Sequence, residues 1–209
     1  MEVGGTRLRL ESGLGIRAYD FYGLAEIGPT MGAECEAQSG LHWAEDHYLI
    51  EVLDPTTLQP VPEGELGMLV ISHLLRQGTP MIRYATNDVA RYTSERCSCG
   101  RTHGRSPGGV VGRNDDLIIY RGAKFYPTQV ESVVRAREGF TGEYMIEIQG
   151  GESDLPVVTV VAESEHPDAE TALRAALKEA LLVTPKVRVV APGTLGRTEF
   201  KAKRVVHVH

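Results

Sequence analysis

The stretch Gly112-Arg113-Asn114-Asp115-Asp116-Leu117-Ile118-Ile119-Tyr120-Arg121-Gly122 separates two halves of the sequence that are patterned differently. Residues 117–120 within it are apolar, and all but Leu117 are β-branched or aromatic, which predicts a strand. Residues 104–109, shortly before it, are rich in Gly and Pro and predict a connection between domains. We therefore expect a domain boundary between residues 111 and 112.

The second half, residues 112–209, alternates strand and helix signals. Pro127 can open a helix as its first residue, and three valines follow it at helical spacing. Further runs predict two strands, an amphipathic helix and a final strand, at residues 144–149, 156–162, 168–182 and 186–190. The resulting βαββαβ order predicts a small sheet with helices on one face, which can fold by itself.

The first half, residues 1–111, is mostly β in pattern. Short β-rich runs at residues 48–53, 67–72 and 89–93 are separated by turn signals and predict a barrel or curled sheet. Before them only residues 16–18 suggest the end of a strand, so this half resembles a remnant of a larger domain. The predicted fold class is therefore α/β of the α+β kind.

Composition and charge exclude several classes of protein. The chain has 209 residues, of which 42% are hydrophobic and 24% charged, as in ordinary globular proteins. Its net charge of −6 provides no global basic field, so we expect neither nucleic acid nor a membrane surface as a partner. No apolar run is long enough to cross a bilayer or to serve as a signal core, which predicts a cytoplasmic location.

The three cysteines cannot all pair with one another, and they cluster with a histidine as Cys35, His42, Cys97 and Cys99. Two thiolates one residue apart on a turn can face one ion, and tetrahedral zinc would take its other two ligands from a neighbouring loop. Three thiolates and one imidazole suit a closed, structural zinc site. Inert buried cysteines are the alternative, and His103 is the substitute ligand if His42 points away.

Four stretches carry side chains suited to chemistry. Tyr22-Gly23-Leu24-Ala25-Glu26 combines an aromatic ring, a glycine and a carboxylate, although taken alone an ordinary turn explains it better. In residues 83–88 a carboxylate follows a turn and could accept hydrogen bonds from sugar hydroxyls, with an ordinary turn again as the alternative. Residues 112–122 place a guanidinium beside paired carboxylates. From Lys186 onward six Lys or Arg stand against one Glu, which is either a phosphate-sized field or a solvated basic face.

Together and in this order, the four stretches resemble the adenylate-forming superfamily, and most closely the phenylacetate–coenzyme A ligase family. The resemblance implies roles in binding ATP. Glu26 would help to hold the magnesium of MgATP, and Tyr22, followed by Gly23, would lie against the adenine. Asp88 would bind the ribose hydroxyls, with Arg113 supporting the same ribose.

The resemblance also implies two half-reactions. Lys201 would contact the carboxylate and the α-phosphate during adenylation, where its charge and the metal stabilise the transition state. Asp115 matches the hinge about which the small C-terminal domain rotates. The rotation would bring the backbone of Arg121 and Gly122 forward, where the pantetheine thiol of coenzyme A approaches the acyl-adenylate.

One part of the family pattern is missing, because no Ser/Thr/Gly-rich phosphate loop ending in Lys precedes Tyr22. The resemblance therefore implies the C-terminal part of a ligase. Residues 1–111 would be the end of the large AMP-binding domain, and residues 112–209 the small mobile domain. A Cys-x-Cys-Gly-Arg-Thr-His stretch that is similar in the family supports the zinc interpretation.

The implied function is activation of an aryl or related carboxylic acid with ATP, followed by transfer to coenzyme A, with magnesium and a structural zinc. The isolated chain is expected to be inactive, and its expected partners include a separate N-terminal half or a second copy. The alternative is a non-catalytic module ordered by zinc, or half of a split enzyme, that binds a protein partner.

Overall fold

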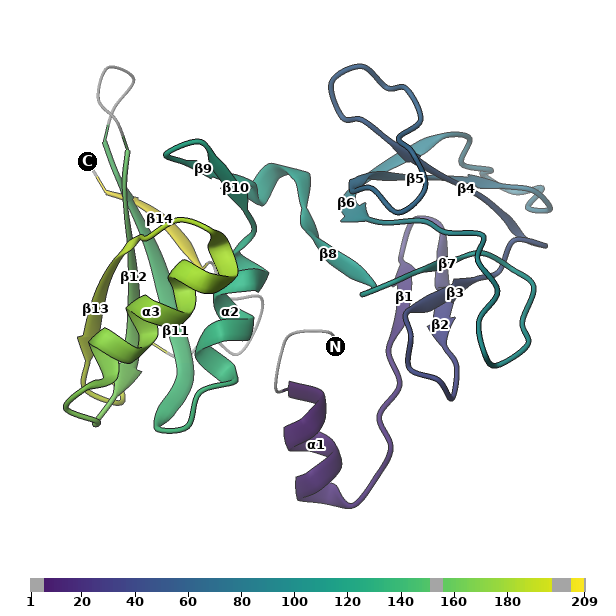
Figure 1. The fold of residues 1–209 in the computed structure, drawn as a ribbon. Coiled ribbons are helices and arrows are strands. Elements are labelled where there is room, and N and C mark those ends of the chain that lie inside the picture. The colour runs from purple at the N-terminus through teal and green to yellow at the C-terminus, as the bar shows by residue number, and fades with distance from the viewer. Residues whose placement is uncertain (1–5, 151–155, 197–203, 209) are drawn as a thin grey trace. The chain divides into compact units, whose positions relative to one another are not determined.

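The computed structural model describes residues 6–150, 156–196 and 204–208 (Figure 1). The described residues divide into two compact units, residues 10–115 and residues 116–208, and residues 6–9 belong to the second. The division therefore lies close to the expected boundary, slightly beyond it in the sequence. Each unit is described by itself below.

The first unit contains two antiparallel four-stranded sheets, with strand orders β1-β2-β3-β7 and β4-β5-β6-β8. The helix α1, Thr6–Leu14, precedes them. The strands are β1 Phe21–Leu24, β2 Gly28–Glu34, β3 Leu41–Trp43, β4 Tyr48–Leu53, β5 Gly67–His73, β6 Tyr84–Ala90, β7 Arg105–Ser106 and β8 Val110–Arg113. The strands predicted at 48–53 and 67–72 are confirmed. No strand end lies at residues 16–18, where that prediction is wrong.

The connection predicted at residues 104–109 is wrong in part. Its Arg105 and Ser106 form β7, which pairs with β3, and Ser106 is fully buried. The Ser106 hydroxyl accepts a 3.0 Å hydrogen bond from Nε1 of the buried Trp43 and donates to the Arg91 carbonyl. Partners distant in sequence therefore hold this Gly- and Pro-rich stretch inside the first unit.

An irregularity in β6 explains why the run predicted at residues 89–93 begins earlier in the structure. The pairing with β5 shifts between Val89 and Ala85, so β6 carries extra residues at this point. Asn87 within them has φ 65°, in the left-handed region that Asn tolerates better than most residues. The interrupted alternation hides the first half of the strand from a pattern search.

The second unit is built on a four-stranded sheet of order β13-β12-β11-β14, with α2 and α3 on one face (Figure 1). The pair β11–β12 is antiparallel, and the pairs β12–β13 and β11–β14 are parallel. After the 3₁₀ turn Asn114–Asp116, the elements are β9 Ile118–Tyr120, β10 Ala123–Phe125, α2 Pro127–Arg135, β11 Phe140–Gln149, β12 Val157–Ser164, α3 Ala169–Leu181, β13 Lys186–Val190 and β14 Val205–Val208. The βαββαβ order is confirmed, with β10 and β14 added.

Local sequence accounts for both helices of the second unit. Pro127 is the first residue of α2, and the side-chain carbonyl of Gln129 accepts a hydrogen bond from the Tyr126 amide at the helix start. In α3 the buried side chains Ala169, Leu173, Leu177 and Leu181 recur every four residues, so one face of the helix packs on the sheet.

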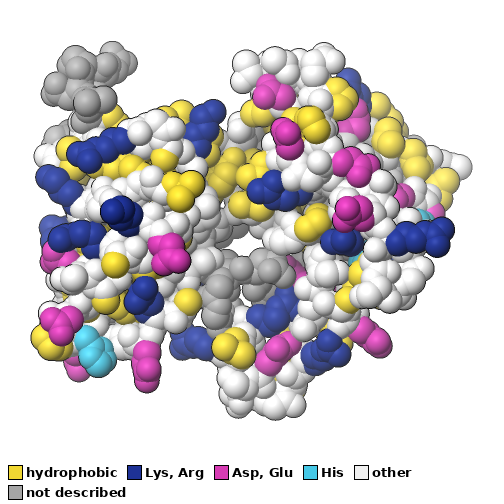
Figure 2. All heavy atoms as spheres, viewed as in Figure 1, with side chains coloured by type: hydrophobic (Ala, Val, Ile, Leu, Met, Phe, Trp, Pro, Cys, Tyr) yellow, Lys and Arg dark blue, Asp and Glu magenta, His cyan; other side chains and the backbone are white. Residues whose placement is uncertain are grey.

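The described residues contain no helix that is long and apolar enough to cross a membrane. On the face of the molecule drawn in Figure 2, acidic and basic side chains of the described residues are interspersed over both units. This surface does not concentrate one sign of charge.

Candidate functional site

Two of the residues predicted to bind nucleotide meet in the first unit, although 66 positions separate them. The Tyr22 hydroxyl donates a 2.5 Å hydrogen bond to Oδ2 of Asp88, which links β1 of one sheet to β6 of the other. The Tyr22 ring also packs edge-on against Trp43, with centroids 5.7 Å apart. Burial and then the contact with Asp88 raise the pKa of Tyr22, so its hydroxyl remains a donor.

Arg113 joins this pair from β8. The register of β6 and β8 places it opposite Asp88, and its Nη1 lies 3.8 Å from Asp88 Oδ1. The same guanidinium donates two hydrogen bonds to the carboxylate of Asp115, of 2.9 and 3.1 Å. These bonds lower the pKa of Asp115. The four residues Tyr22, Asp88, Arg113 and Asp115 thus form one network, called here the Asp88 network.

Hydrogen bonds in the irregular part of β6 hold the backbone at Asp88. The Thr86 hydroxyl accepts a hydrogen bond from the Asp88 amide and donates one to the Leu69 carbonyl. Asp88 is only 8% exposed. A buried carboxylate is stable when it is hydrogen-bonded or paired with a cation, and here the Tyr22 phenol supplies the hydrogen bond and the Arg113 guanidinium the ion pair.

Glu26 is close in sequence to Tyr22 of the Asp88 network and lies on the exposed turn after β1. Arg76 donates to the backbone carbonyls of Glu26 and Ile27, at 3.4 and 2.9 Å, and His73 Nε2 lies 2.9 Å from the Ile27 carbonyl. A Cβ at Gly23 would lie 2.0 Å from the Pro29 carbonyl oxygen, so the turn requires glycine there. Sequence reasoning missed His73 and Arg76, because neither belongs to a motif.

The predicted coenzyme A-facing residues form the tip of the β9–β10 hairpin. Tyr120 pairs with Ala123, which leaves a two-residue turn in which Arg121 has φ 49° and Gly122 has φ 82°. A two-residue turn of this kind needs positive φ at both positions, which Gly supplies without strain. The Arg121 guanidinium lies 5.2 Å from the centroid of the Tyr120 ring.

The remaining predicted catalytic residue, Lys201, lies outside the described residues. The segment before it is anchored on the second unit, where the Leu195 amide donates a 2.7 Å hydrogen bond to the carboxylate of Glu163, which is buried in β12. After it, Arg204 donates to the Glu143 carboxylate and the Tyr144 carbonyl. The ends of the stretch that carries Lys201 are therefore held by β11 and β12.

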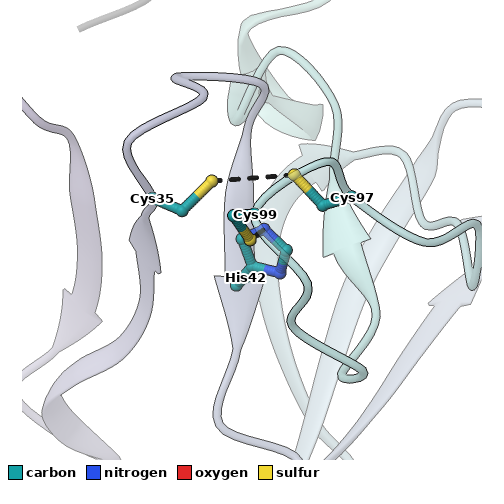
Figure 3. A group of neighbouring side chains, drawn as sticks. All are labelled: Cys35, His42, Cys97 and Cys99. Atoms are coloured by element: carbon teal, nitrogen blue, oxygen red, sulfur yellow. Dashed lines mark hydrogen bonds between the residues drawn. The ribbon is translucent and has the colours of Figure 1, made fainter.

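All four predicted metal ligands come together in the first unit (Figure 3). One donor atom from each of Cys35, His42, Cys97 and Cys99 lies within 4.8 Å of the others. Cys35 follows β2, His42 is in β3, and the two remaining cysteines are in the loop between β6 and β7. His103 is not in this group, because its Nδ1 lies 3.0 Å from the Trp43 carbonyl.

The distances in the group agree with tetrahedral zinc. Two sulfurs bound to one zinc lie about 3.8 Å apart, and a sulfur and an imidazole nitrogen about 3.6 Å apart, when each ligand keeps its usual bond length. The Cys35 and Cys97 sulfurs are 3.7 Å apart, and Cys99 Sγ is 3.6 Å from His42 Nε2. The sulfurs are too far apart for a disulfide.

The chemistry of the donors also fits a metal. The Cys99 amide, the Ser39 hydroxyl and the His42 ring lower the pKa of Cys97 to about 5, which favours the thiolate that binds metals. Among the described residues, His42 Nδ1 is buried without a hydrogen-bond partner. His42 Nε2 lies 3.6 Å from the Cys99 sulfur, so the ring presents this nitrogen to the group. A neutral histidine that binds a metal through Nε2 carries its proton on Nδ1.

Known proteins resemble the chain over nearly its whole length. The phenylacetate–coenzyme A ligase of Thermus thermophilus is 38% identical over 96% of this chain and 50% of its own length. That of Pseudomonas putida is 36% identical over 95% and 47%. Residues 122–208 match the AMP-binding enzyme C-terminal domain. The chain belongs to the phenylacetate–coenzyme A ligase family. It spans about half the length of the curated relatives it matches, and it corresponds to their C-terminal part.

Solved structures agree with this family assignment. The 2-hydroxyisobutyryl-CoA ligase in the postadenylation state, in complex with R3-HIB-AMP, has a TM-score of 0.89 at 32% identity, over 99% of this chain and 46% of that chain. The same ligase in the thioesterification state, in complex with 2-HIB-AMP and CoA, has a TM-score of 0.52 over the same shares.

Proposed function

We propose that this chain supplies the ribose-binding, hinge and lysine parts of an AMP-forming acid–coenzyme A ligase. The enzyme would activate an aryl or related carboxylic acid with ATP and transfer the acyl group to coenzyme A. The observation that carries the proposal is the Asp88 network, because it brings together residues from three separate motifs of the family.

The Asp88 network suits a ribose. A carboxylate accepts hydrogen bonds from two neighbouring hydroxyls, and the Arg113 guanidinium lies beside Asp88. The Tyr22 hydroxyl is hydrogen-bonded to Asp88 Oδ2, so a hydroxyl of a bound ribose would replace it as the donor to that oxygen. Release from Asp88 would leave the Tyr22 ring available to lie against the adenine.

Glu26 is the proposed magnesium ligand. Its side chain is exposed, and among the described residues no hydrogen bond or ion pair engages its carboxylate. Carboxylate oxygens suit Mg²⁺, which when bound would neutralise phosphate charge during adenylation. The chain's own contribution is to hold the turn that presents Glu26, through Arg76 and His73.

Asp115, the last residue of the first unit, is the proposed hinge about which the second unit rotates between the two half-reactions. In the solved 2-hydroxyisobutyryl-CoA ligase, the region that this chain matches differs between the postadenylation and thioesterification states, as the two TM-scores imply. Arg121 and Gly122 would face coenzyme A after the rotation.

The cysteine and histidine group is proposed to hold one structural zinc. Four protein ligands close the coordination sphere, so the ion would have no open position for substrate. Its effect would be to join the loop before β7 to β2 and β3. The distances between the ligand atoms and the lowered pKa of Cys97 support this assignment.

The test uses pyrophosphate exchange driven by phenylacetate. The chain is assayed alone and with the N-terminal half of the Thermus thermophilus ligase supplied in trans. We expect no exchange by the chain alone and measurable exchange by the mixture. Asp88→Asn should raise the KM for ATP by about tenfold, the value of one charged hydrogen bond, whereas the exposed Asp46→Asn should leave it unchanged.

Exchange by the chain alone would contradict the proposed need for a partner half. A mixture that binds no nucleotide would instead favour a zinc-ordered module that recognises a protein. Isothermal titration with AMP separates these results, because it needs no turnover.

A further inference from the structure

The proposed zinc ligands differ in their access to solvent. Cys35, Cys97 and His42 are 4%, 8% and 5% exposed, whereas Cys99 is exposed. Cys99 is therefore the most accessible of the three cysteines to a reagent in solution. Access and thiolate character both decide which cysteine reacts first. Without metal, thiolate character favours Cys97, so the order proposed here depends on the access to Cys99.

Cys99 and Cys35 both line a hollow of about 570 Å³ on the first unit. Arg17 and Arg101 line it, against the single acidic side chain of Glu36. A hydrogen bond from Arg17 to the Glu36 carbonyl holds that guanidinium at the rim. Two cations against one anion make the entrance positively charged, which favours the approach of anionic reagents over neutral ones such as hydrogen peroxide.

We propose that Cys99 is an oxidative modification site through which peroxides release the zinc, an inference that depends on the metal site proposed above. In the first step the Cys99 thiolate attacks the peroxide, the O–O bond breaks, and a sulfenic acid and hydroxide form. In the second step a Cys35 thiolate attacks the Cys99 sulfur, which forms a disulfide and expels a second hydroxide. Two protons convert the hydroxides to water, so two thiolates reduce one peroxide.

Cys35 is the partner because of where it lies. Its sulfur is within 4.8 Å of that of Cys99, and it comes from a different part of the chain. Cys97 is only two positions from Cys99, where a disulfide would close a small ring and strain the required dihedral angle. Loss of Cys35 and Cys99 would leave only Cys97 and His42, which are too few ligands for stable zinc binding.

The experiment adds stoichiometric hydrogen peroxide to the zinc-loaded full chain. A chromophoric zinc indicator records metal release, and mass spectrometry after alkylation maps the cysteines. We expect one zinc released for each Cys35–Cys99 disulfide, and recovery of zinc binding after reduction with a dithiol. Retention of zinc, or first modification at Cys97, would overturn the inference.

A charge variant tests the role of the entrance without touching a proposed ligand. Iodoacetate is anionic and iodoacetamide is neutral, so the ratio of their rates at Cys99 reports the local field. Arg101→Gln should lower the iodoacetate rate by about threefold, in keeping with the loss of one nearby charge, and leave the iodoacetamide rate unchanged. Lys178→Gln, an exposed position of the second unit, is the control and should alter neither rate. An unchanged ratio in Arg101→Gln would show that the entrance does not steer anions.

The two proposals fail in different ways. Zinc content before oxidant is added judges the metal site, and the order of cysteine modification judges this inference. A chain without zinc in which Cys99 still reacts first would refute the metal site alone. A zinc-loaded chain in which a buried cysteine reacts first would refute the modification site alone.

Discussion

At the scale of single residues, the two candidate sites use burial in opposite ways. Asp88 is buried but both of its oxygens face a donor, so the anion is stabilised in place. His42 is buried with one ring nitrogen left without a partner among the described residues, which is costly unless the other nitrogen gains a strong interaction. A metal at Nε2 would supply that interaction.

Substitution of a proposed zinc ligand should remove the metal. Protein purified without added metal should contain about one zinc per chain. Cys97→Ser should lose this zinc and lower the midpoint of thermal unfolding, because a structural ion contributes folding free energy. Elemental analysis and a thermal melt are the measurements. His103→Ala, a nearby residue outside the group, is the control and should retain its zinc.

Lys201→Ala should separate the two half-reactions in the mixture with an N-terminal half. The charge is needed while the carboxylate attacks ATP, so adenylation should fall by about 10²- to 10³-fold. Thioester formation from synthetic acyl-adenylate should change little. Equal loss in both assays would indicate misfolding or a shared binding role.

At the scale of elements, prediction from the sequence succeeded where packing and local pattern agree. The helix α3 was predictable because its buried residues recur at one spacing, and β12 and β13 because both are rich in valine. The sheet containing β1, β2 and β3 was not predicted, since its short strands include Gly and Pro. Its order depends on partners such as Ser106 that lie far along the chain.

The same contrast applies to the candidate sites. The metal group could be predicted, because few cysteines leave few combinations. The contact between Tyr22 and Asp88 could not be derived from spacing, because it joins two sheets. Only the resemblance to a family placed both residues near one ligand.

The end of α3 provides a test of local strain. Leu182 has φ 56° and ψ 15° and is 89% exposed, so it adopts a left-handed conformation without burying its side chain. Leu182→Gly should raise the free energy of unfolding by about 1 kcal/mol, because Gly adopts this conformation without strain. Chemical denaturation measures it. Leu182→Ala is the matched control, and an equal gain there would contradict the explanation.

Restriction of the proposed hinge should affect the second half-reaction. Proline fixes φ near about −65°, so Asp115→Pro should hold the second unit in one orientation. We expect adenylation by the mixture to survive and transfer to coenzyme A to fall. Asp115→Ala keeps the backbone mobile and removes the contact with Arg113, so it distinguishes a hinge effect from loss of the ion pair. Normal transfer in the proline variant would place the hinge elsewhere.

At the scale of the whole molecule, each unit has its own core. One hydrophobic cluster joins α2 and α3 to their sheet in the second unit, and another surrounds Trp43 in the first. The cysteine and histidine group belongs to the first unit only.

Metal removal should therefore act on one unit. In differential scanning calorimetry we expect two transitions, of which a zinc chelator lowers only the one assigned to the first unit. Measurement of residues 116–209 as a separate fragment would assign the other transition. A chelator that lowers both transitions equally would show that the units unfold together.

The position of the chain's single tryptophan has a practical consequence for observing this protein. Trp43 is buried in the first unit and touches the Tyr22 ring, whose hydroxyl reaches Asp88. Its fluorescence is therefore an intrinsic optical reporter on that unit, and it does not respond to unfolding confined to the second. A ligand that displaces Tyr22 from Asp88 would move a ring beside the indole and change its emission, so nucleotide binding could be followed without any label.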